Sequence, residues 1–290
     1  MRTSNIVLVA SIENQTGNLI DLFDTMAIHK VNFVVGSKTK NREPVPFFGI
    51  NNVIVGICLN GKNRGISRNK RQLPNLLQLD YQVFDRNVSV KMGERMIHLT
   101  GLKNKDQGVK VMESLFEHVA MTKNNVELVV NWDEETKRNA LEQLKELFYN
   151  KEAIHNLDSR GLKYLAVFSY EYDNVEEYLE KVKSILYNRR EISIPRVKDI
   201  NICNGVYISS FNCSIPLLKT AQMLSKLNKY EVLFHNWNSK RNICIAINRL
   251  GKTHKFTIHR NGSVKQYSPS DFDEAEKVLD EVTRDILTVI

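Results

Sequence analysis

The sequence predicts an α+β fold in which one strand–helix–strands–helix repeat occurs twice, on either side of an α/β insertion. Residues 88–102 and 256–270 each show a strand pattern, a turn at Gly93 or Gly262, a second strand pattern and the start of a helix. A further strand and helix pattern precedes each of these segments. Positive charge is concentrated in the two flanks of the chain. These observations together indicate an internal duplication with a cationic, strand-rich part.

Charge divides the chain into the same three parts. The expected boundaries are residues 1–122 for the first repeat, 123–200 for the insertion and 201–290 for the second repeat. The formal net charge is +8, yet the insertion carries 13 basic against 15 acidic side chains. Residues 204–268 hold ten Lys or Arg side chains and one acid, Glu231. This separation suggests one face for a polyanion and another for a different partner, although a basic surface that only solvates the chain is the simpler alternative.

The first repeat begins with an apolar strand pattern and ends with an amphipathic helix. Leu19, Leu22, Phe23 and Met26 share one helical face. A basic loop is expected between the middle strands, because residues 60–75 hold five basic residues and no acid among Gly, Asn and Pro. The expected elements are strands over 5–12, 31–35 and 51–59, a helix over 18–28, a loop over 60–80, a hairpin over 87–101 and a helix over 105–121.

The second repeat has the same order with fewer interruptions. Pro216 suits the first turn of its first helix, and Asn261–Gly262 between strand patterns is a strong hairpin signal. Ser268 or Ser270 is expected to cap the final helix. The expected elements are strands over 205–215, 230–234, 242–247, 254–260 and 263–268, and helices over 216–228 and from 271 onward.

The insertion fits neither repeat. Its expected elements are strands over 126–132 and 162–170 and helices over 134–149 and 173–188.

Several classes of protein are not supported by the sequence. No apolar run approaches the length of a membrane span, and the run Ile6–Ala10 is too short for a signal peptide. The nucleotide-binding and metalloprotease motifs are absent, and no cofactor or metal is expected. We expect an intracellular non-enzyme whose cysteines are reduced core residues, at Cys58, Cys203, Cys213 and Cys244.

Three short motifs in this duplicated order resemble the TATA-box-binding protein family, in particular divergent members from large DNA viruses. "NIV" at 5–7 is similar to the start of the family's first strand. "PFFG" at 46–49 is similar to its "FPG" turn. "GERMIHLTGLKNKDQGVKVMESLFEHV", from Gly93, resembles its hairpin and amphipathic helix. The second repeat keeps only the glycine, the valine and the helix of this last motif. The resemblance covers about 200 residues.

The resemblance implies a saddle whose curved antiparallel sheet binds the DNA minor groove, while helices on the convex side face other transcription factors. Asn5 matches the family's asparagine that bonds groove acceptors, and Asn204 is its candidate counterpart; both are also ordinary turn residues. Phe47 or Phe48 matches one apolar wedge, with Phe234 as the second-repeat candidate; core packing is the simpler alternative. The remaining wedge positions fall on Met92 (or Val90) and His259, which departs from the family's Phe and predicts weaker bending.

Phosphate contacts are expected from basic residues in the first long loop and the second repeat. These candidates are Lys62, Arg64, Arg68, Lys70, Arg71, Lys240, Arg241, Arg249, Lys252 and Lys255.

Two functions remain open, with a nuclease- or glycosylase-like domain as a third, weaker reading. The first is a monomeric transcription initiation factor that binds and bends A/T-rich double-stranded DNA and contacts TFIIB-like factors or polymerase subunits. The second is a protein-interaction scaffold of the same fold in a viral transcription or virion complex. The expected location is the host nucleus, a cytoplasmic viral factory or the virion.

Overall fold

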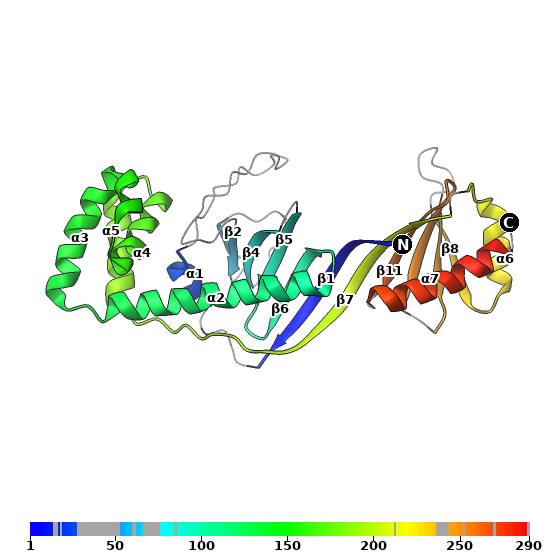
Figure 1. Cartoon of the computed structure of the whole chain (residues 1–290), viewed down its shortest axis with the longest axis horizontal. Coiled ribbons are helices and arrows are strands. Elements are labelled where there is room, and N and C mark those ends of the chain that lie inside the picture. The colour runs from blue at the N-terminus through cyan, green and yellow to red at the C-terminus, as the bar shows by residue number, and fades with distance from the viewer. Residues whose placement is uncertain are drawn as a thin grey trace. The chain divides into compact units, whose positions relative to one another are not determined.

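Figure 1 shows the computed structural model of the chain. The structure describes residues 1–13, 17, 19–27, 53–59, 62–65, 76–83, 86–211, 213–235, 244–251, 253–268 and 271–288. The chain divides into two compact units. Unit 1 contains Met1–Val9, Leu99–Gly108 and Ile200–Ile290, and unit 2 contains Ala10–His98 and Val109–Asp199.

The order of strands and helices along the chain repeats. The strands are β1 (Arg2–Ile12), β2 (Val53–Leu59), β3 (Lys62–Gly65), β4 (Leu76–Val83), β5 (Arg86–Met92), β6 (Met96–Leu102), β7 (Val197–Ser210), β8 (Tyr230–His235), β9 (Cys244–Arg249), β10 (Lys255–His259) and β11 (Ser263–Ser268). The α-helices are α1 (Leu19–Thr25), α2 (Lys105–Val130), α3 (Glu134–Tyr149), α4 (Arg160–Val167), α5 (Val175–Tyr187), α6 (Leu217–Lys226) and α7 (Phe272–Leu287), and the 3-10 helices are η1 (Lys151–Asn156) and η2 (Phe168–Glu171).

The strand order confirms the predicted duplication. Hydrogen bonds connect the strands in the order β3-β2-β4-β5-β6-β1-β7-β11-β10-β9-β8. When β3 is set aside, the five strands of each repeat, numbered along the chain, lie in the same order 1-5-4-3-2. In each repeat a helix follows the first strand and another follows the fifth. The fold is therefore α+β, as predicted, with two copies of one topology.

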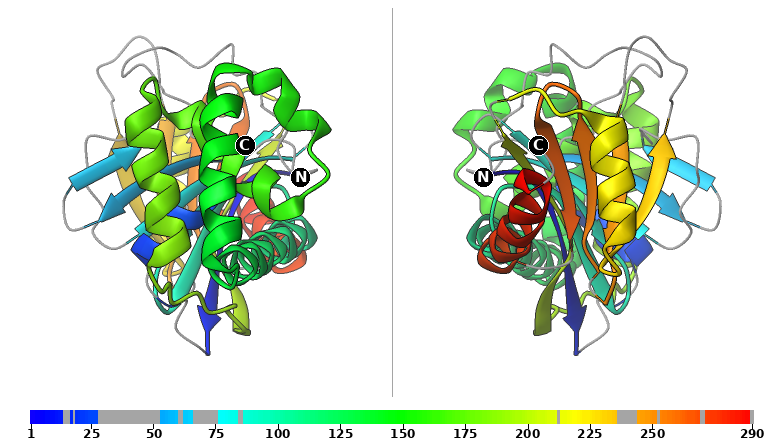
Figure 2. Two further views of the ribbon diagram at one scale, coloured as in Figure 1. Left: turned by 90° about the vertical axis from the view of Figure 1, so that its left-hand side faces the viewer. Right: turned by 90° about the vertical axis from the view of Figure 1, so that its right-hand side faces the viewer.

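Unit 1 packs α6 and α7 against one face of its strands. Figure 2, right, shows α6 in yellow and α7 in red beside the strands of this unit. Alternate residues of the strands supply the core, as expected for a sheet with one buried face. The helices complete the core with Leu217, Ala221 and Leu224 from α6 and Val278 and Val282 from α7. All of these residues are buried.

Unit 2 has the same kind of core, formed by α1 and α2 on strands β4 to β6. Leu22 and Leu115 are fully buried on the helix side. Leu79 and Val90 are fully buried on the strand side and pair across β4 and β5. In this core the hydroxyl of Tyr81 lies 2.9 Å from Nδ1 of His118.

The insertion is helical, which corrects both of its predicted strands. Residues 126–130 continue α2, whose buried positions Val119, Thr122, Val126 and Val129 keep the spacing of one helix face. Residues 162–170 form most of α4 and most of η2, and nearly all of them are buried. A short apolar run that is buried on every side carries no period, so it cannot be assigned to a strand from sequence. The predicted helices over 134–149 and 173–188 are confirmed as α3 and α5.

The insertion helices form a small core of their own. Figure 2, left, shows α3 and α5 side by side. The ring of Phe148 in α3 stacks on the ring of Tyr178 in α5, with 5.5 Å between centroids. The Tyr178 hydroxyl donates to the Leu165 carbonyl oxygen at 3.2 Å, which ties α5 to α4.

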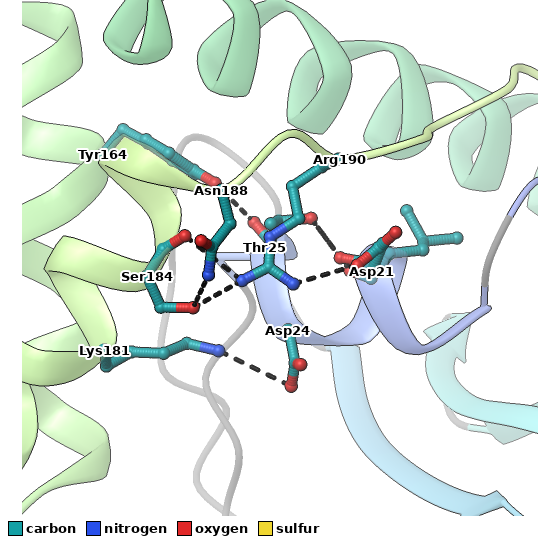
Figure 3. A network of polar contacts seen from close by, with 9 residues as sticks. Asp21, Asp24, Thr25, Tyr164, Lys181, Ser184, Asn188 and Arg190 are labelled. Carbon is teal, nitrogen blue, oxygen red and sulfur yellow. Dashed lines mark hydrogen bonds and ion pairs between the residues drawn. The ribbon is translucent and has the colours of Figure 1, made fainter.

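A polar network fastens α1 to the insertion (Figure 3). Nη1 of Arg190 lies 2.9 Å from Oδ1 of Asp21, and Nη2 of Arg190 donates to the Ser184 hydroxyl at 2.6 Å. Lys181 lies 3.5 Å from Asp24. The Tyr164 hydroxyl donates to the carbonyl oxygen of Thr25 at 2.7 Å. The insertion thus covers the outer side of the short first-repeat helix with complementary charge, and we call this network the α1 latch.

The predicted loop over 60–80 is wrong at both of its described parts. Residues 62–65 form β3 and residues 76–83 form β4. Leu59 pairs with Lys62, so only Asn60–Gly61 separates β2 from β3. Asn-Gly is a hairpin signal, and the apolar alternation through Leu77, Leu79 and Tyr81 is a strand signal; the basic composition of the segment concealed both.

Two smaller expectations also fail. Cys203 and Cys213 are free and exposed instead of lying in the core. The final helix is capped by Asp271, whose carboxylate accepts from the Glu274 backbone N–H at 3.0 Å, while Ser268 ends β11. An ionised cap at a helix N-terminus also interacts favourably with the helix dipole. Of the helices in the described ranges, none has both the length and the apolar character that crossing a bilayer requires.

Candidate nucleic-acid interface

One face of the unit 1 sheet points away from α6 and α7, and we call it the open face. Side chains alternate across a strand, so burial identifies which residues lie on it. In β1, Ile6 and Leu8 are buried, which places Asn5 on the opposite face. In β7, Tyr207 is fully buried, which places Asn204 on that same open face. β1 and β7 are neighbours in the sheet, so the structure brings both predicted asparagines onto adjacent strands of one surface.

The strand register fixes the neighbours on the open face. β7, β11, β10, β9 and β8 pair in antiparallel fashion, and residues opposite each other share a face. Two consecutive rows run Ile208–Lys265–Thr257–Ala246–Leu233 and Val206–Tyr267–Lys255–Asn248–Glu231.

The open face combines cations with exposed apolar surface. Lys255 and Lys265 are exposed, and within the described ranges neither has a carboxylate partner. Tyr267 is 37% exposed and Leu233 is 40% exposed. Glu231, the acid in these rows, accepts a hydrogen bond from the Asn248 amide at 2.8 Å. The central rows are thus apolar and cationic, and their acid lies on the outermost strand, β8.

The side chain of Asn5 is held by the backbone of β6, the neighbour of β1 in the sheet. The backbone N–H of Gly101 donates to Oδ1 of Asn5 at 2.9 Å. Gly101 has φ of +98°, a conformation that glycine adopts without strain. Lys103, two residues further on, donates to the Thr3 carbonyl oxygen at 3.1 Å. The side-chain amide of Asn5 also carries two N–H donors, which suit acceptors on base edges.

His259 lies at the end of β10, half-buried, in the same alternation as Thr257 and Lys255. Burial lowers the pKa of His259, and the positive charge of Lys265 lowers this pKa further. Both effects favour the neutral imidazole, which has one donor and one acceptor nitrogen.

The wedge predicted at Met92 (or Val90) is wrong. Met92 and Val90 are both fully buried, on the face of β5 that packs on the helices. Met92 pairs with Leu77 and Val90 pairs with Leu79, both of which are also fully buried. The side chains of β5 on the other face are Ser89 and Lys91, by alternation. Neither is an apolar wedge.

The phosphate contact predicted at Arg249 is also contradicted. Nη2 of Arg249 lies 3.5 Å from Oε2 of Glu281 in α7, and Nη1 donates to the Lys229 and Leu250 carbonyl oxygens. The guanidinium group also lies 5.6 Å from the centre of the Tyr230 ring. Arg249 alternates with the buried residues Ile245 and Ile247, so it binds the acidic last helix on the side opposite the open face.

Eleven of the predicted residues lie partly or wholly outside the described part of the structure. Lys62 and Arg64 pair with Leu59 and Ile57 through their backbones, and Phe234 pairs with Ile245; the side chains of these three lie outside the described part of the structure. The rest lie wholly outside the described residues: Phe47, Phe48, Arg68, Lys70, Arg71, Lys240, Arg241 and Lys252.

Sequence reasoning missed the most prominent residues of the open face. Lys265 and Tyr267 lie in "SVKQYS", which was recognised as a strand. Their alternation with the buried residues Val264 and Gln266 would have assigned them to the exposed face. Within the described ranges, no group of three or more His, Cys, Asp or Glu side chains forms a metal site.

Comparison with known proteins gives a weak likeness among solved structures alone. No protein-family model matches the chain, and no curated protein matches it. Among solved structures, the chain is similar to "Methanococcus jannaschii TBP", with a TM-score of 0.45 and 11% identity over 99% of this chain and 98% of that chain. A likeness at this level supports no inference by itself. The duplicated topology follows from the strand order, and the open face follows from the strand register and the burial pattern.

Proposed function

We propose that the chain binds double-stranded DNA through the open face of unit 1, as a transcription initiation factor of the TATA-box-binding type. The observation that carries the proposal is the arrangement of Lys255 and Lys265 among exposed apolar side chains, on a sheet face that also holds Asn5 and Asn204. The repeated order of strands and helices along the chain is the one expected from the sequence resemblance. Its place of action would be a nucleus or a viral factory.

The chemistry of this face suits the minor groove. Lysine ammonium groups neutralise phosphates and release counterions. The floor of the minor groove presents mainly acceptors, which asparagine N–H donors can bond without distinguishing A·T from T·A. Val206, Ile208 and Tyr267 offer apolar surface to the deoxyribose walls. A sheet can occupy this groove when the groove is widened.

Bending is expected to be weak. Met92 is buried in the core of unit 2, so a wedge at this position would first have to leave that core. His259, at the corresponding position of the second repeat, is polar and half-buried. Phe47 and Phe48 remain the wedge candidates.

The scaffold function is the second candidate, and the α1 latch favours it. A helical module that is fastened to the first repeat through Arg190 and Asp21 adds surface for protein partners without adding cations to the open face. Under this reading duplex affinity would not exceed that of any basic protein.

Fluorescence anisotropy with labelled 20-bp duplexes tests the proposal. We expect the A/T-rich duplex to bind more tightly than a G/C-rich one, and affinity to fall by roughly tenfold or more per fourfold rise in salt if two or more phosphates are neutralised. Equal affinity for both duplexes, at the level of a basic protein of the same charge, would favour the scaffold.

DNA bending tests the two wedge candidates, Phe47 and Phe48. Replacing Phe47 and Phe48 together with Ala should reduce DNA bending, measured by energy transfer between end labels, more than it reduces affinity. Tyr149→Ala, at an aromatic residue that is 73% exposed in the insertion, is the matched control and should leave bending unchanged. Unchanged bending in the Phe47/Phe48 variant would remove these residues from the interface.

A further inference from the structure

A groove lies beside the start of α6, outside the open face. It has a volume of about 560 Å³. Its apolar lining comes from Ile215, Pro216, Leu217 and Leu218, and its charged lining residues are Lys219 and Arg260. Ile215 and Leu217 are buried and form the floor, whereas Leu218 is 50% exposed at the rim. All of these residues belong to unit 1.

Backbone contacts hold the walls of the groove in place. The Ile215 N–H donates to the Arg260 carbonyl oxygen at 2.8 Å, and the Phe211 N–H donates to the Gly262 carbonyl oxygen at 3.0 Å. Gly262 has φ of +81°, and a Cβ there would lie 2.3 Å from the Cys213 carbonyl oxygen. The β10–β11 turn is thus clamped to the segment before α6. A preformed groove orders little on binding, which favours affinity.

The charged side chains that line the groove are of one sign. Both charged lining residues are cations, and α6 itself has two lysines and no acid. The β10–β11 turn, His259 to Ser263, contains no acid either. The outer side of α6 adds Met223, which is 40% exposed. The surface therefore suits a ligand whose apolar groups lie beside negatively charged groups.

The first repeat shows what can cover a helix in this position. α1 occupies the same place in the repeat order as α6. Its outer acids, Asp21 and Asp24, are paired with Arg190 and Lys181 of the insertion. In the second repeat the described chain provides no such module, and the helix carries the opposite charge. A partner for α6 would accordingly be acidic.

We propose that the groove at α6 is a docking site for an acidic segment of a partner protein that contains large apolar side chains. Apolar residues of the segment would pack on Leu217 and Leu218, and its carboxylates would pair with Lys219 and Arg260. A nucleic acid is the less suitable ligand, because phosphates would gain nothing from the apolar floor. This site goes beyond the DNA-binding function and lies on a different surface of unit 1, at the helix side of the sheet.

The test uses the full chain and a fluorescein-labelled probe peptide, (Asp-Phe-Asp-Leu)₄, in anisotropy titrations. We expect saturable binding of this probe, and much weaker binding of oligo-Glu of the same length and of (Lys-Phe-Lys-Leu)₄. Lys219→Glu should weaken probe binding by about tenfold, and Leu218→Ser by about five- to tenfold, as for anchor residues. Lys226→Glu, on the same helix but outside the groove, is the matched control and should change it less than about twofold.

Three outcomes would overturn the proposal. The first is equal binding of oligo-Glu, which would show attraction by charge alone. The second is an equal effect of Lys226→Glu and Lys219→Glu. The third is displacement of the probe by an unlabelled 20-bp duplex, which would assign the groove to nucleic acid. DNA affinity is measured on the same Leu218→Ser and Lys219→Glu samples and should remain within about threefold of the parent. Failure of the groove is therefore distinguishable from failure of the DNA-binding function.

Discussion

Helices α1 and α6 occupy the same position in the two repeats, yet the rest of the chain covers α1 more fully than α6. α1 has seven residues, of which Leu19, Leu22, Phe23 and Thr25 are buried. α6 has ten residues and buries only one face, so that Leu218 and Met223 remain exposed. The difference arises from the insertion, whose helices cover α1 through the α1 latch.

This difference shows how one topology can serve two purposes. Where the chain supplies its own cover, the helix becomes part of a core and can be short, because tertiary packing replaces helix propensity. Where no cover is supplied, the helix must be amphipathic and longer, and its outer side is available to a partner. Substitutions at matched positions of the two helices should therefore act on different properties.

The largest contrast is expected for leucine truncation. Leu22→Ala in α1 removes a side chain that is 0% exposed, and should lower the free energy of unfolding by about 3 kcal/mol. Leu218→Ala in α6 removes one that is 50% exposed, and should change stability by no more than about 0.5 kcal/mol. Urea denaturation followed by circular dichroism measures both. Similar losses would show that α6 is covered in the same way as α1.

Breaking the α1 latch should have the next largest effect. Arg190→Ala leaves the carboxylate of Asp21, which is 15% exposed, without its ion pair, and should cost about 2 kcal/mol because buried charges depend on their partners. Lys183→Ala breaks an exposed pair with Glu180 in the same helical module, and should cost less than about 0.5 kcal/mol.

A double-mutant cycle identifies the cause. Asp21→Asn should recover part of the loss in the Arg190→Ala background, and hydrogen exchange should show α1 opening more often in the single variant. Additive losses in the cycle would mean that Arg190 acts through Ser184 and not through Asp21.

A pH effect is expected from the core of the first repeat. Burial lowers the pKa of His118 to about 4, so the unfolded chain, in which the pKa is near 6.5, binds a proton first as pH falls. Stability therefore decreases below pH 6.5, by about 2 kcal/mol between pH 7 and pH 5 from this group alone. Denaturation midpoints at these two pH values measure it. His118→Gln should reduce the pH dependence, and an unchanged slope in this variant would assign the effect elsewhere.

The sequence supported the duplicated order better than the surfaces that the order creates. The hairpins ending at Leu102 and Ser268 have glycine turns and period-two patterns, both of which are local signals. By contrast, the strand predicted at Val126–Trp132 depended on β-branched residues, which α2 tolerates because their spacing fits its buried face. Whether an apolar run is covered on one side or on all sides is decided by tertiary packing, which a single sequence does not contain.

The candidate site was predicted in part, for the same reason. Asn5 and Asn204 were identified through the family resemblance, and the structure places both on the open face. Met92 was assigned to a wedge by its distance from a glycine, whereas the alternation through Val88, Val90 and Met92 already marked one buried face. The ion pair of Arg249 could not have been predicted from the sequence, because its partner Glu281 lies 32 residues away in the chain.

The most direct test of the DNA-binding face is a charge reversal on the two faces of unit 1. Lys255→Glu with Lys265→Glu changes the open face, and Lys226→Glu with Lys277→Glu makes the same change in charge on exposed residues of α6 and α7. We predict that the open-face variant loses about tenfold or more in affinity for the 20-bp A/T-rich duplex, with a shallower salt dependence, while the helix-face variant keeps most of its affinity. Equal losses in the two variants would contradict it, because attraction would then follow net charge and not the face that the sheet presents.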